Sequence, residues 1–235
     1  MNELERVEAQ AVRDAVVLGG GRGEMVGGAM CVSQPLLPIL ELNRAIVLSD
    51  AVDLDAIGDW FDGPHHIATR DEALKRDLER RGYEPARTWM KFERDASPAP
   101  QHESQLQVEE TTDAKVFGQL LANDPASPMA AMVGAPGWHC FVGRIEGEPA
   151  ATGVLYVDGT TAWIGVGFTR PEFRRRGAQS ALLAARVEAA RALGATAMTT
   201  ETGELLPDQP ASSYNNILRA GFREAYLRPN WRSPE

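Results

Sequence analysis

The sequence predicts a protein of the α/β (α+β) class with a mixed, mostly antiparallel twisted sheet flanked by helices. A smaller α+β domain precedes this sheet in the chain. Two patterns in the second half of the chain support this fold class. After a helix expected at residues 113–121, three strand-like runs joined by short turns lie at 139–146, 150–157 and 161–169. A helix with an apolar stripe, a short strand, a second helix and a last strand follow at 177–193, 197–200, 212–220 and 222–228.

The first half of the chain contains a shorter alternation of the same kinds of element. Apolar residues spaced three and four apart predict a helix at residues 4–18. The glycine-rich stretch at 19–23 indicates a flexible turn rather than a phosphate loop, because no Gly-Lys-Ser/Thr follows it. The other expected elements are strands at 29–32, 45–48 and 88–92 and helices at 53–61 and 72–81.

A linker separates the two halves. Residues 93–105 contain Pro98 and Pro100 and no large apolar side chain, which is typical of a connecting segment. We therefore expect an N-terminal domain at 1–95, a linker at 96–105 and a larger domain at 106–235. Gly82-Tyr83 and Gly221-Phe222 each follow a predicted helix, an echo that indicates either a structural duplication or a chance similarity of a common helix ending.

Charge and composition exclude several kinds of partner. The net charge of -9 disfavours nucleic acid, and no apolar run approaches the ~20 residues that a membrane span needs. Acidic residues near the start argue against a signal peptide, so a cytoplasmic protein is expected. Cys31 and Cys140 lie outside metal-binding patterns, and His65-His66 has no third ligand nearby, so no metal site is expected.

The turn before the helix at 177–193 carries the clearest chemistry. Arg170, Arg174, Arg175 and Arg176 lie within seven residues of an otherwise acidic chain. Gly177 allows an anion to approach the backbone, where the first turn of a helix presents free N–H groups. A solvated basic corner is the alternative, but cations at a helix N-terminus oppose the helix dipole. The pattern therefore predicts a polyphosphate-binding turn.

This turn resembles motif A of the GCN5-related N-acetyltransferase (GNAT) family, Arg/Gln-x-x-Gly-x-Gly/Ala. Arg174 and Gly177 match, whereas Gln179 replaces the usual Gly or Ala, so its side chain would either clash with a phosphate or hydrogen-bond it. The preceding Pro171-Glu172-Phe173 also resembles the family, and the resemblance covers roughly residues 108–230. Because the first half lacks the motif, the chain resembles a tandem GNAT protein with a degenerate N-terminal half. That half would wall the acceptor pocket, with Trp60, Phe61, Tyr83 and Trp89 as candidate apolar surface.

The resemblance implies acetyl-CoA as the co-substrate and no metal. The acetyl group would pass directly to a small-molecule or peptide amine in a ternary complex. A homodimer is compatible with the sequence. The implied cofactor-binding residues are Phe168, Thr169, Arg174, Arg175, Arg176, Gly177, Ala178, Gln179 and Asn216, with Asn215 as the alternative to Asn216.

The catalytic residues implied by the resemblance leave alternatives open. Glu201, which follows the strand at 197–200, is the candidate base or else only a loop carboxylate. Ile217 stands where the family commonly has a Tyr acid, so Tyr214 and Tyr226 are candidates unless they are only packed aromatics. The missing Tyr also leaves room for a non-catalytic acyl-CoA sensor. Transfer of a longer acyl group is a third alternative.

Overall fold

The computed structural model describes residues 2–37, 39–100, 104–207 and 211–234, so residues 101–103 of the predicted linker lie outside the described residues. The helices are α1 (Glu3–Leu18), α2 (Leu54–Trp60), α3 (Glu72–Arg80), α4 (Ala114–Ala122), α5 (Ala178–Ala192) and α6 (Ser212–Arg219). The first six strands are β1 (Arg22–Val26), β2 (Ala29–Ser33), β3 (Asn43–Val47), β4 (His66–Ala68), β5 (Glu84–Pro85) and β6 (Trp89–Asp95). The others are β7 (Gln107–Glu110), β8 (Trp138–Ile145), β9 (Glu148–Asp158), β10 (Thr161–Thr169), β11 (Ala197–Gly203), β12 (Arg223–Arg228) and β13 (Asn230–Arg232).

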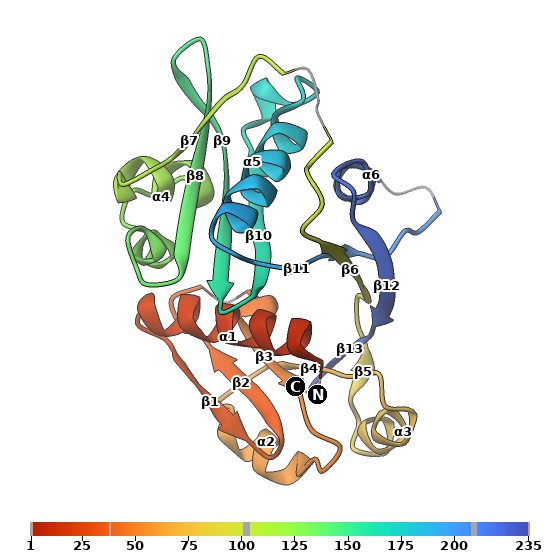
Figure 1. The fold of residues 1–235 in the computed structure, drawn as a ribbon. Helices are drawn as coiled ribbons and strands as arrows, with labels where there is room; N and C mark the ends of the chain where they lie inside the picture. The colour runs from red at the N-terminus through yellow and green to blue at the C-terminus, as the bar shows by residue number, and fades with distance from the viewer. Residues whose placement is uncertain (1, 38, 101–103, 208–210, 235) are drawn as a thin grey trace.

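The strands form two mixed sheets with helices on their faces, which confirms the predicted α/β fold class (Figure 1). The seven-stranded sheet has the order β12-β6-β11-β10-β9-β8-β7, and the six-stranded sheet has the order β1-β2-β3-β4-β13-β5. In the larger sheet, β8, β9 and β10 are antiparallel neighbours, and α5 connects β10 to the parallel strand β11. The turn between β8 and β9 has positive φ at Glu146 and Gly147, as expected for a tight hairpin.

The smaller sheet repeats this order of elements. β1, β2 and β3 are antiparallel neighbours, and α2 connects β3 to the parallel strand β4. α3 and β5 then follow β4 as α6 and β12 follow β11. The echo at Gly82 and Gly221 therefore lies at corresponding places, where both glycines have positive φ after a helix. This common order favours duplication over chance similarity.

Each half gives one strand to the sheet of the other half. β6 lies between β11 and β12, although it precedes the predicted linker. In return, β13 lies between β4 and β5, although it comes near the end of the chain. The predicted linker at 96–105 thus separates chain segments but not sheets.

The strands absent from the sequence prediction are β1, β4, β5, β7 and β13. They contain two to five residues, and β1, β5 and β7 lie at sheet edges with mostly exposed side chains, so they show little apolar alternation. His66, at a position where the sequence predicted no strand, belongs to β4.

α1 packs between the two sheets (Figure 1). Val7 and Ala11 contact the core beside Trp163 of β10, whereas Val12 and Val16 contact Ile46 of β3. α5 and α6 cover the opposite face of the larger sheet. No helix in the described ranges is both long enough and apolar enough to cross a bilayer.

Candidate functional site

A cleft opens where β10 and β11 separate. The two strands pair in parallel only from Thr161 to Trp163 of β10. Beyond this point β10 stays beside β9, whereas β11 continues beside β6. The cleft between them has a volume of about 1450 Å³, and it lies at the carboxyl ends of two neighbouring parallel strands, where open sheets commonly bind ligands.

The structure brings almost all the predicted cofactor-binding residues into this C-terminal cleft. Those that line it are Phe168, Thr169, Arg174, Arg175, Gly177, Ala178, Gln179 and Asn216. Arg176 is the exception, because its guanidinium lies 5.7 Å from the centre of the Phe173 ring and does not line the cleft. Trp89, at the start of β6, also lines it, whereas Trp60, Phe61 and Tyr83 pack into the core of the N-terminal half.

The turn before α5 has the backbone geometry of an anion site. Arg175 has φ 62° and Gly177 has φ 76°, and left-handed residues of this kind form concave turns lined by N–H groups. The N-cap of α5 is Gly177, which makes no side-chain cap. Within the described residues, the first N–H groups of the helix are therefore not occupied by a capping side chain.

A β-bulge interrupts β10 beside this turn. The register with β9 shifts between Gly165 and Phe168, and Val166 has φ 50°, which is strained for a β-branched residue. Gln179 donates its amide to the carbonyl of Phe168 at 2.9 Å and to Thr169 Oγ1 at 2.8 Å. The residue that departs from motif A therefore binds the strand next to the bulge.

Glu201 lies inside β11, which continues three residues beyond its predicted end, so the residue is not in a loop. Its carboxylate lines the C-terminal cleft and is 10% exposed. It also accepts hydrogen bonds from Lys91 Nζ at 2.9 Å, Arg228 Nη2 at 3.0 Å and Arg44 Nη2 at 3.3 Å. These donors leave Glu201 Oε1 with a single hydrogen bond from the described cations, so it has a lone pair to accept a proton.

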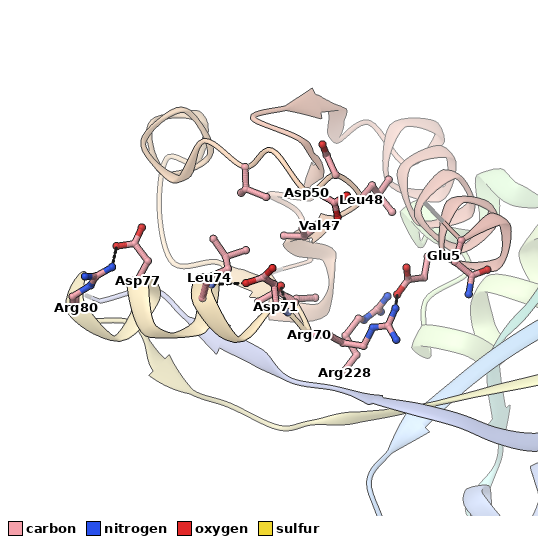
Figure 2. Close-up of a pocket in the computed structure, with 16 residues that line it drawn as sticks. Glu5, Val47, Leu48, Asp50, Arg70, Asp71, Leu74, Asp77, Arg80 and Arg228 are labelled. Atoms are coloured by element: carbon pink, nitrogen blue, oxygen red, sulfur yellow. Dashed lines mark hydrogen bonds and ion pairs between the residues drawn. The ribbon is translucent and has the colours of Figure 1, made fainter.

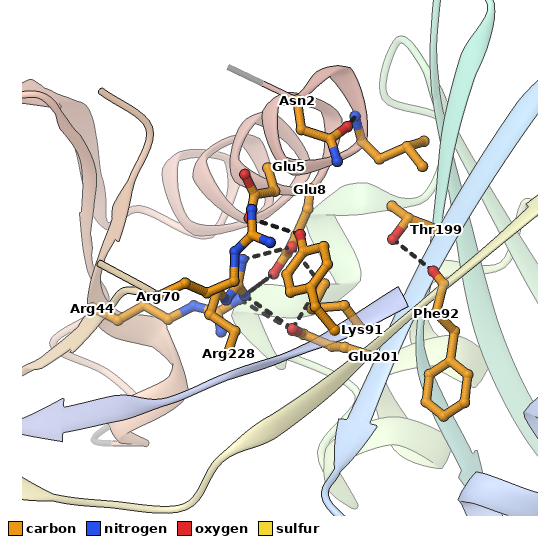
Figure 3. Close-up of polar contacts among 12 residues, drawn as sticks. Asn2, Glu5, Glu8, Arg44, Arg70, Lys91, Phe92, Thr199, Glu201 and Arg228 are labelled. Carbon is orange, nitrogen blue, oxygen red and sulfur yellow. Dashed lines mark hydrogen bonds and ion pairs between the residues drawn. The ribbon is translucent and has the colours of Figure 1, made fainter. Parts of the chain in front are cut away.

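Glu201 belongs to a buried group of charges that we call the junction cluster (Figure 3). Its members are Glu8, Arg44, Lys91, Glu201 and Arg228, from α1, β3, β6, β11 and β12. Arg228 makes two contacts with Glu8, at 2.5 and 3.0 Å. Because its members come from both halves of the chain, the cluster joins them. Its three cations face two carboxylates, which leaves one excess positive charge.

The charges in the junction cluster are mutually stabilised. Burial by itself raises the pKa of Glu8, but attraction to Arg228, Lys91 and Arg44 outweighs burial and holds this pKa well below its ordinary range. Burial by itself lowers the pKa of Arg228, but Glu8 and Glu201 more than offset it and leave the pKa raised. Both groups are therefore charged at neutral pH.

Comparisons with known proteins agree with this geometry. The model of the Acetyltransferase (GNAT) family matches residues 89–209. This range begins at β6 and contains the turn before α5 that lines the C-terminal cleft.

The chain belongs to the GNAT family of acetyltransferases.

Solved structures share the fold at low identity. A GCN5-related N-acetyltransferase from Kribbella flavida is 16% identical with a TM-score of 0.71, and the match covers 100% of this chain and 97% of that one. One from Sphaerobacter thermophilus is also 16% identical, with a TM-score of 0.59 and coverage of 77% and 64%. A tandem GNAT protein from the clavulanic acid biosynthesis pathway is 14% identical, with a TM-score of 0.58 and coverage of 82% and 76%. No curated protein gives a significant match.

The two tyrosines proposed as acids lie outside the cleft of this GNAT protein. Tyr214 is buried against Phe92 and donates to Glu224 at 2.5 Å, and burial together with this carboxylate raises its pKa to about 12. Tyr226 donates to Glu5 at 2.7 Å, and burial followed by Glu5 raises its pKa. α6 thus presents Asn216 to the cleft and Tyr214 to the core, so the structure does not bring either phenol to the cofactor turn.

Sequence reasoning missed Arg186 and four members of the junction cluster. Arg186 lines the C-terminal cleft but lies in α5 among the buried residues Leu182, Leu183 and Val187. A charged residue within an apolar stripe was a usable signal for it. The cluster members come from five separate elements, so no local pattern indicates that they meet.

A second cleft occupies the corresponding place in the N-terminal half (Figure 2). It has a volume of about 510 Å³ and lies at the ends of β3 and β4 beside α3. Its arginines are paired: Arg70 lies 3.5 Å from Glu5, Arg80 lies 3.1 Å from Asp77, and Arg228 belongs to the junction cluster. Because Arg228 lines this N-terminal cleft and Glu201 lines the C-terminal cleft, the junction cluster forms the wall between them.

Proposed function

We propose that the protein transfers an acetyl group from acetyl-CoA to an amine by direct attack in a ternary complex. Membership of the GNAT family supports acyl-CoA-dependent acetyl transfer in general. The observation that carries the specific proposal is the uncapped turn at Gly177, placed at the mouth of a cleft between separating strands. Such a turn favours a pyrophosphate through free N–H groups and the helix dipole.

The cofactor would lie along β10. Its pyrophosphate would bind at Gly177 and Ala178, with Arg174 and Arg175 supplying positive charge. The pantetheine arm would follow the edge of β10 that β11 leaves unpaired, next to Phe168 and Thr169. N–H groups at the bulge would then polarise the thioester carbonyl and stabilise the oxyanion that forms on attack.

The acceptor amine must lose a proton before it attacks, because an alkyl amine has a solution pKa of about 10.4. Glu201 is the proposed proton acceptor, acting through water, since it is the cleft-lining carboxylate on the strand facing β10. Its three cationic neighbours hold the carboxylate in one place but also compete for its lone pairs.

The role of Glu201 can be tested with Glu201→Gln. If the carboxylate is the base, kcat falls by about 100-fold and the acid side of the pH–rate profile changes, while the affinity for CoA stays within about threefold. If the residue only holds the junction cluster together, the free energy of unfolding falls and the shape of the pH–rate profile is unchanged. The second result would contradict the proposed base.

A non-catalytic acyl-CoA sensor is the second candidate function. It is favoured by Ile217 at the usual position of the acid and by the location of Tyr214 and Tyr226 outside the cleft. Calorimetric titration with CoA and acetyl-CoA tests the cofactor assignment, and release of free thiol from acetyl-CoA with a panel of amines tests transfer. Binding with thiol release supports the enzyme, and binding without release across the panel supports the sensor. A lack of binding to either compound would exclude both.

A further inference from the structure

Arg186 is a buried cation without a counter-ion among the described residues. Its side chain belongs to α5 and the residue is 1% exposed. Its hydrogen bonds to described residues all go to carbonyl oxygens: Nε donates to Leu182 at 3.0 Å, and Nη1 donates to Gly165 at 2.9 Å and to Val154 at 3.3 Å. In the described ranges, no salt bridge involves this guanidinium, whereas the buried arginines of the junction cluster face two carboxylates.

The neighbouring backbone is shaped to hold this guanidinium. A Cβ added at Gly153 of β9 would lie 2.7 Å from Arg186 Cζ, so a larger residue there would displace the guanidinium from its present position. Gly165, which accepts from Nη1, is the last paired residue before the bulge of β10. Arg186 is therefore enclosed between β9 and the near end of the bulge.

Gln179 contacts the far end of the same bulge. It lies on α5 seven residues, or about two turns, before Arg186, and it donates to the carbonyl of Phe168, where pairing with β9 resumes. The two side chains thus hold both ends of the unpaired segment Val166–Gly167, which contains the strained φ of Val166.

A buried charge without a partner does not favour folding. Burial lowers the pKa of Arg186 to about 9, so the group stays charged at neutral pH. Even a buried ion pair often adds no stability relative to apolar side chains of similar size, and Arg186 lacks a counter-ion among the described residues. Stability therefore does not account for a guanidinium at this position of an otherwise apolar stripe.

We infer that Arg186 is a positioning residue that, with Gln179, fixes the bulge of β10 and places a positive charge beneath the thioester carbonyl. The inference rests on the proposed binding of acetyl-CoA. Arg186 lies nine positions after Gly177, a rise of about 13 Å along the helix, so the charge lies toward the acyl end of the cofactor and away from the pyrophosphate. Because Arg186 itself is buried, its positive charge is weakly screened and strengthens the polarisation of the carbonyl by the bulge N–H groups.

The test compares Arg186→Met with the unaltered protein by difference infrared spectroscopy of acetyl-CoA labelled with ¹³C at the thioester carbonyl. On binding to the unaltered protein, the carbonyl band shifts to lower frequency. In Arg186→Met the inference predicts that this shift falls by half or more, that kcat falls about tenfold with any amine the panel yields, and that the affinity for CoA stays within about threefold. An equal band shift in both proteins would overturn the inference.

Stability separates positioning from a merely structural role. We expect the urea midpoint of Arg186→Met to change little, because removing a buried charge without a counter-ion offsets the loss of its three hydrogen bonds to carbonyls, and a fall large enough to explain the lost kcat by unfolding would overturn the inference. Arg186→Lys should recover part of the band shift, Gln179→Ala should lose part of it, and Arg191→Met, on the same helix but outside the cleft, should match the unaltered protein. An unaltered protein that binds neither CoA nor acetyl-CoA would overturn the proposed function as well, whereas binding with an unaltered band shift in the variants overturns this inference alone.

Discussion

The two clefts of this protein share the same arrangement of strands and helices but differ in the charge and capping of the loop before the connecting helix. Each lies at the carboxyl ends of a parallel pair of strands, β3 with β4 or β10 with β11, and each is bordered by the helix that follows the second strand. In the C-terminal cleft, α5 begins at Gly177 with no side-chain cap. In the N-terminal half, the Asp53 side chain caps α2 and accepts from the N–H groups of Asp55 and Ala56.

The strands of the two clefts differ as well. β10 has a bulge at Val166, whereas the pairs that β3 makes with β2 and β4 continue without a shift of register. The loop before α2 carries Asp50 and Asp53 where the loop before α5 carries arginines. The shared arrangement of strands and helices alone therefore does not account for the proposed cofactor site. A free helix start, a bulge and local positive charge are what distinguish the C-terminal cleft.

The largest effect is expected from a variant that disrupts the junction cluster between the two clefts. Glu8→Gln removes a fully buried carboxylate that faces Arg228, Lys91 and Arg44, and leaving these cations partly unpaired should lower the free energy of unfolding by about 3–5 kcal/mol. Urea denaturation at pH 7 measures this loss. Glu3→Gln, exposed on the same helix, should change it by less than about 0.5 kcal/mol.

The same variant has an expected pH dependence. Because the folded pKa of Glu8 lies below its unfolded value of about 4.3, its contribution is fully present above that pH and is lost as the pH falls through the lower folded value. The stability difference between Glu8→Gln and the unaltered protein should therefore shrink below about pH 4. A difference under about 1 kcal/mol at pH 7 would show that the cluster does not hold the halves together.

A second variant gives the C-terminal cleft the cap that the N-terminal half has. Gly177→Asp places a carboxylate at the start of α5 and forces a side chain onto a residue with φ 76°, so CoA should bind at least about 100-fold more weakly. Calorimetry measures the affinity. Gly20→Asp, with φ 82° and open space around it, controls for the backbone strain. CoA affinity within fivefold of normal in Gly177→Asp would contradict the assignment.

The arginines of the two clefts are expected to differ in their effect on CoA binding. Joint Arg174→Ala and Arg175→Ala should weaken CoA binding about tenfold at 0.15 M salt, and the loss should decrease at higher salt because both side chains are exposed. Arg80→Ala, which removes an arginine from the N-terminal cleft, should leave CoA affinity unchanged. If Arg80→Ala weakens binding as much as the double variant, the charge contrast between the clefts is not what selects the cofactor.

The smallest effect is expected at Tyr214. Since its phenol lies in the core and donates to Glu224, Tyr214→Phe should cost about 1 kcal/mol of stability and change kcat by less than about threefold. Thiol release assays and urea denaturation measure the two effects. A loss of kcat above about 50-fold at normal stability would assign Tyr214 the role of acid after all.

Local patterns in the sequence predicted the strand and the helix on either side of the proposed cofactor turn well. The helix from 178 to 192, the strand before it and the residues of the turn all lie within one continuous stretch, so spacing and charge were sufficient. Gln179 shows the limit of such patterns. Its hydrogen bonds to Phe168 and Thr169 depend on how α5 packs on β10, which the motif does not specify.

Long-range pairing was not predictable in the same way. β6 and β13 are internal strands, yet each lies in the sheet of the opposite half. The residues of Trp89–Asp95 and Asn230–Arg232 do not indicate with which strands they pair. The junction cluster has the same origin. Lys91 and Arg228 come close to Glu8 and Glu201 because this exchange places β6 between β11 and β12.

The exchange of β6 and β13 also constrains how the protein is made. On the ribosome, the first sheet stays without one of its internal strands until residues 230–232 have emerged, after almost all of the other half has been synthesised. A protein started at residue 104 would lack β6 and leave β11 and β12 without the strand that joins them. Biosynthesis therefore has to deliver both halves before either sheet is complete, and they should mature as one cooperative unit.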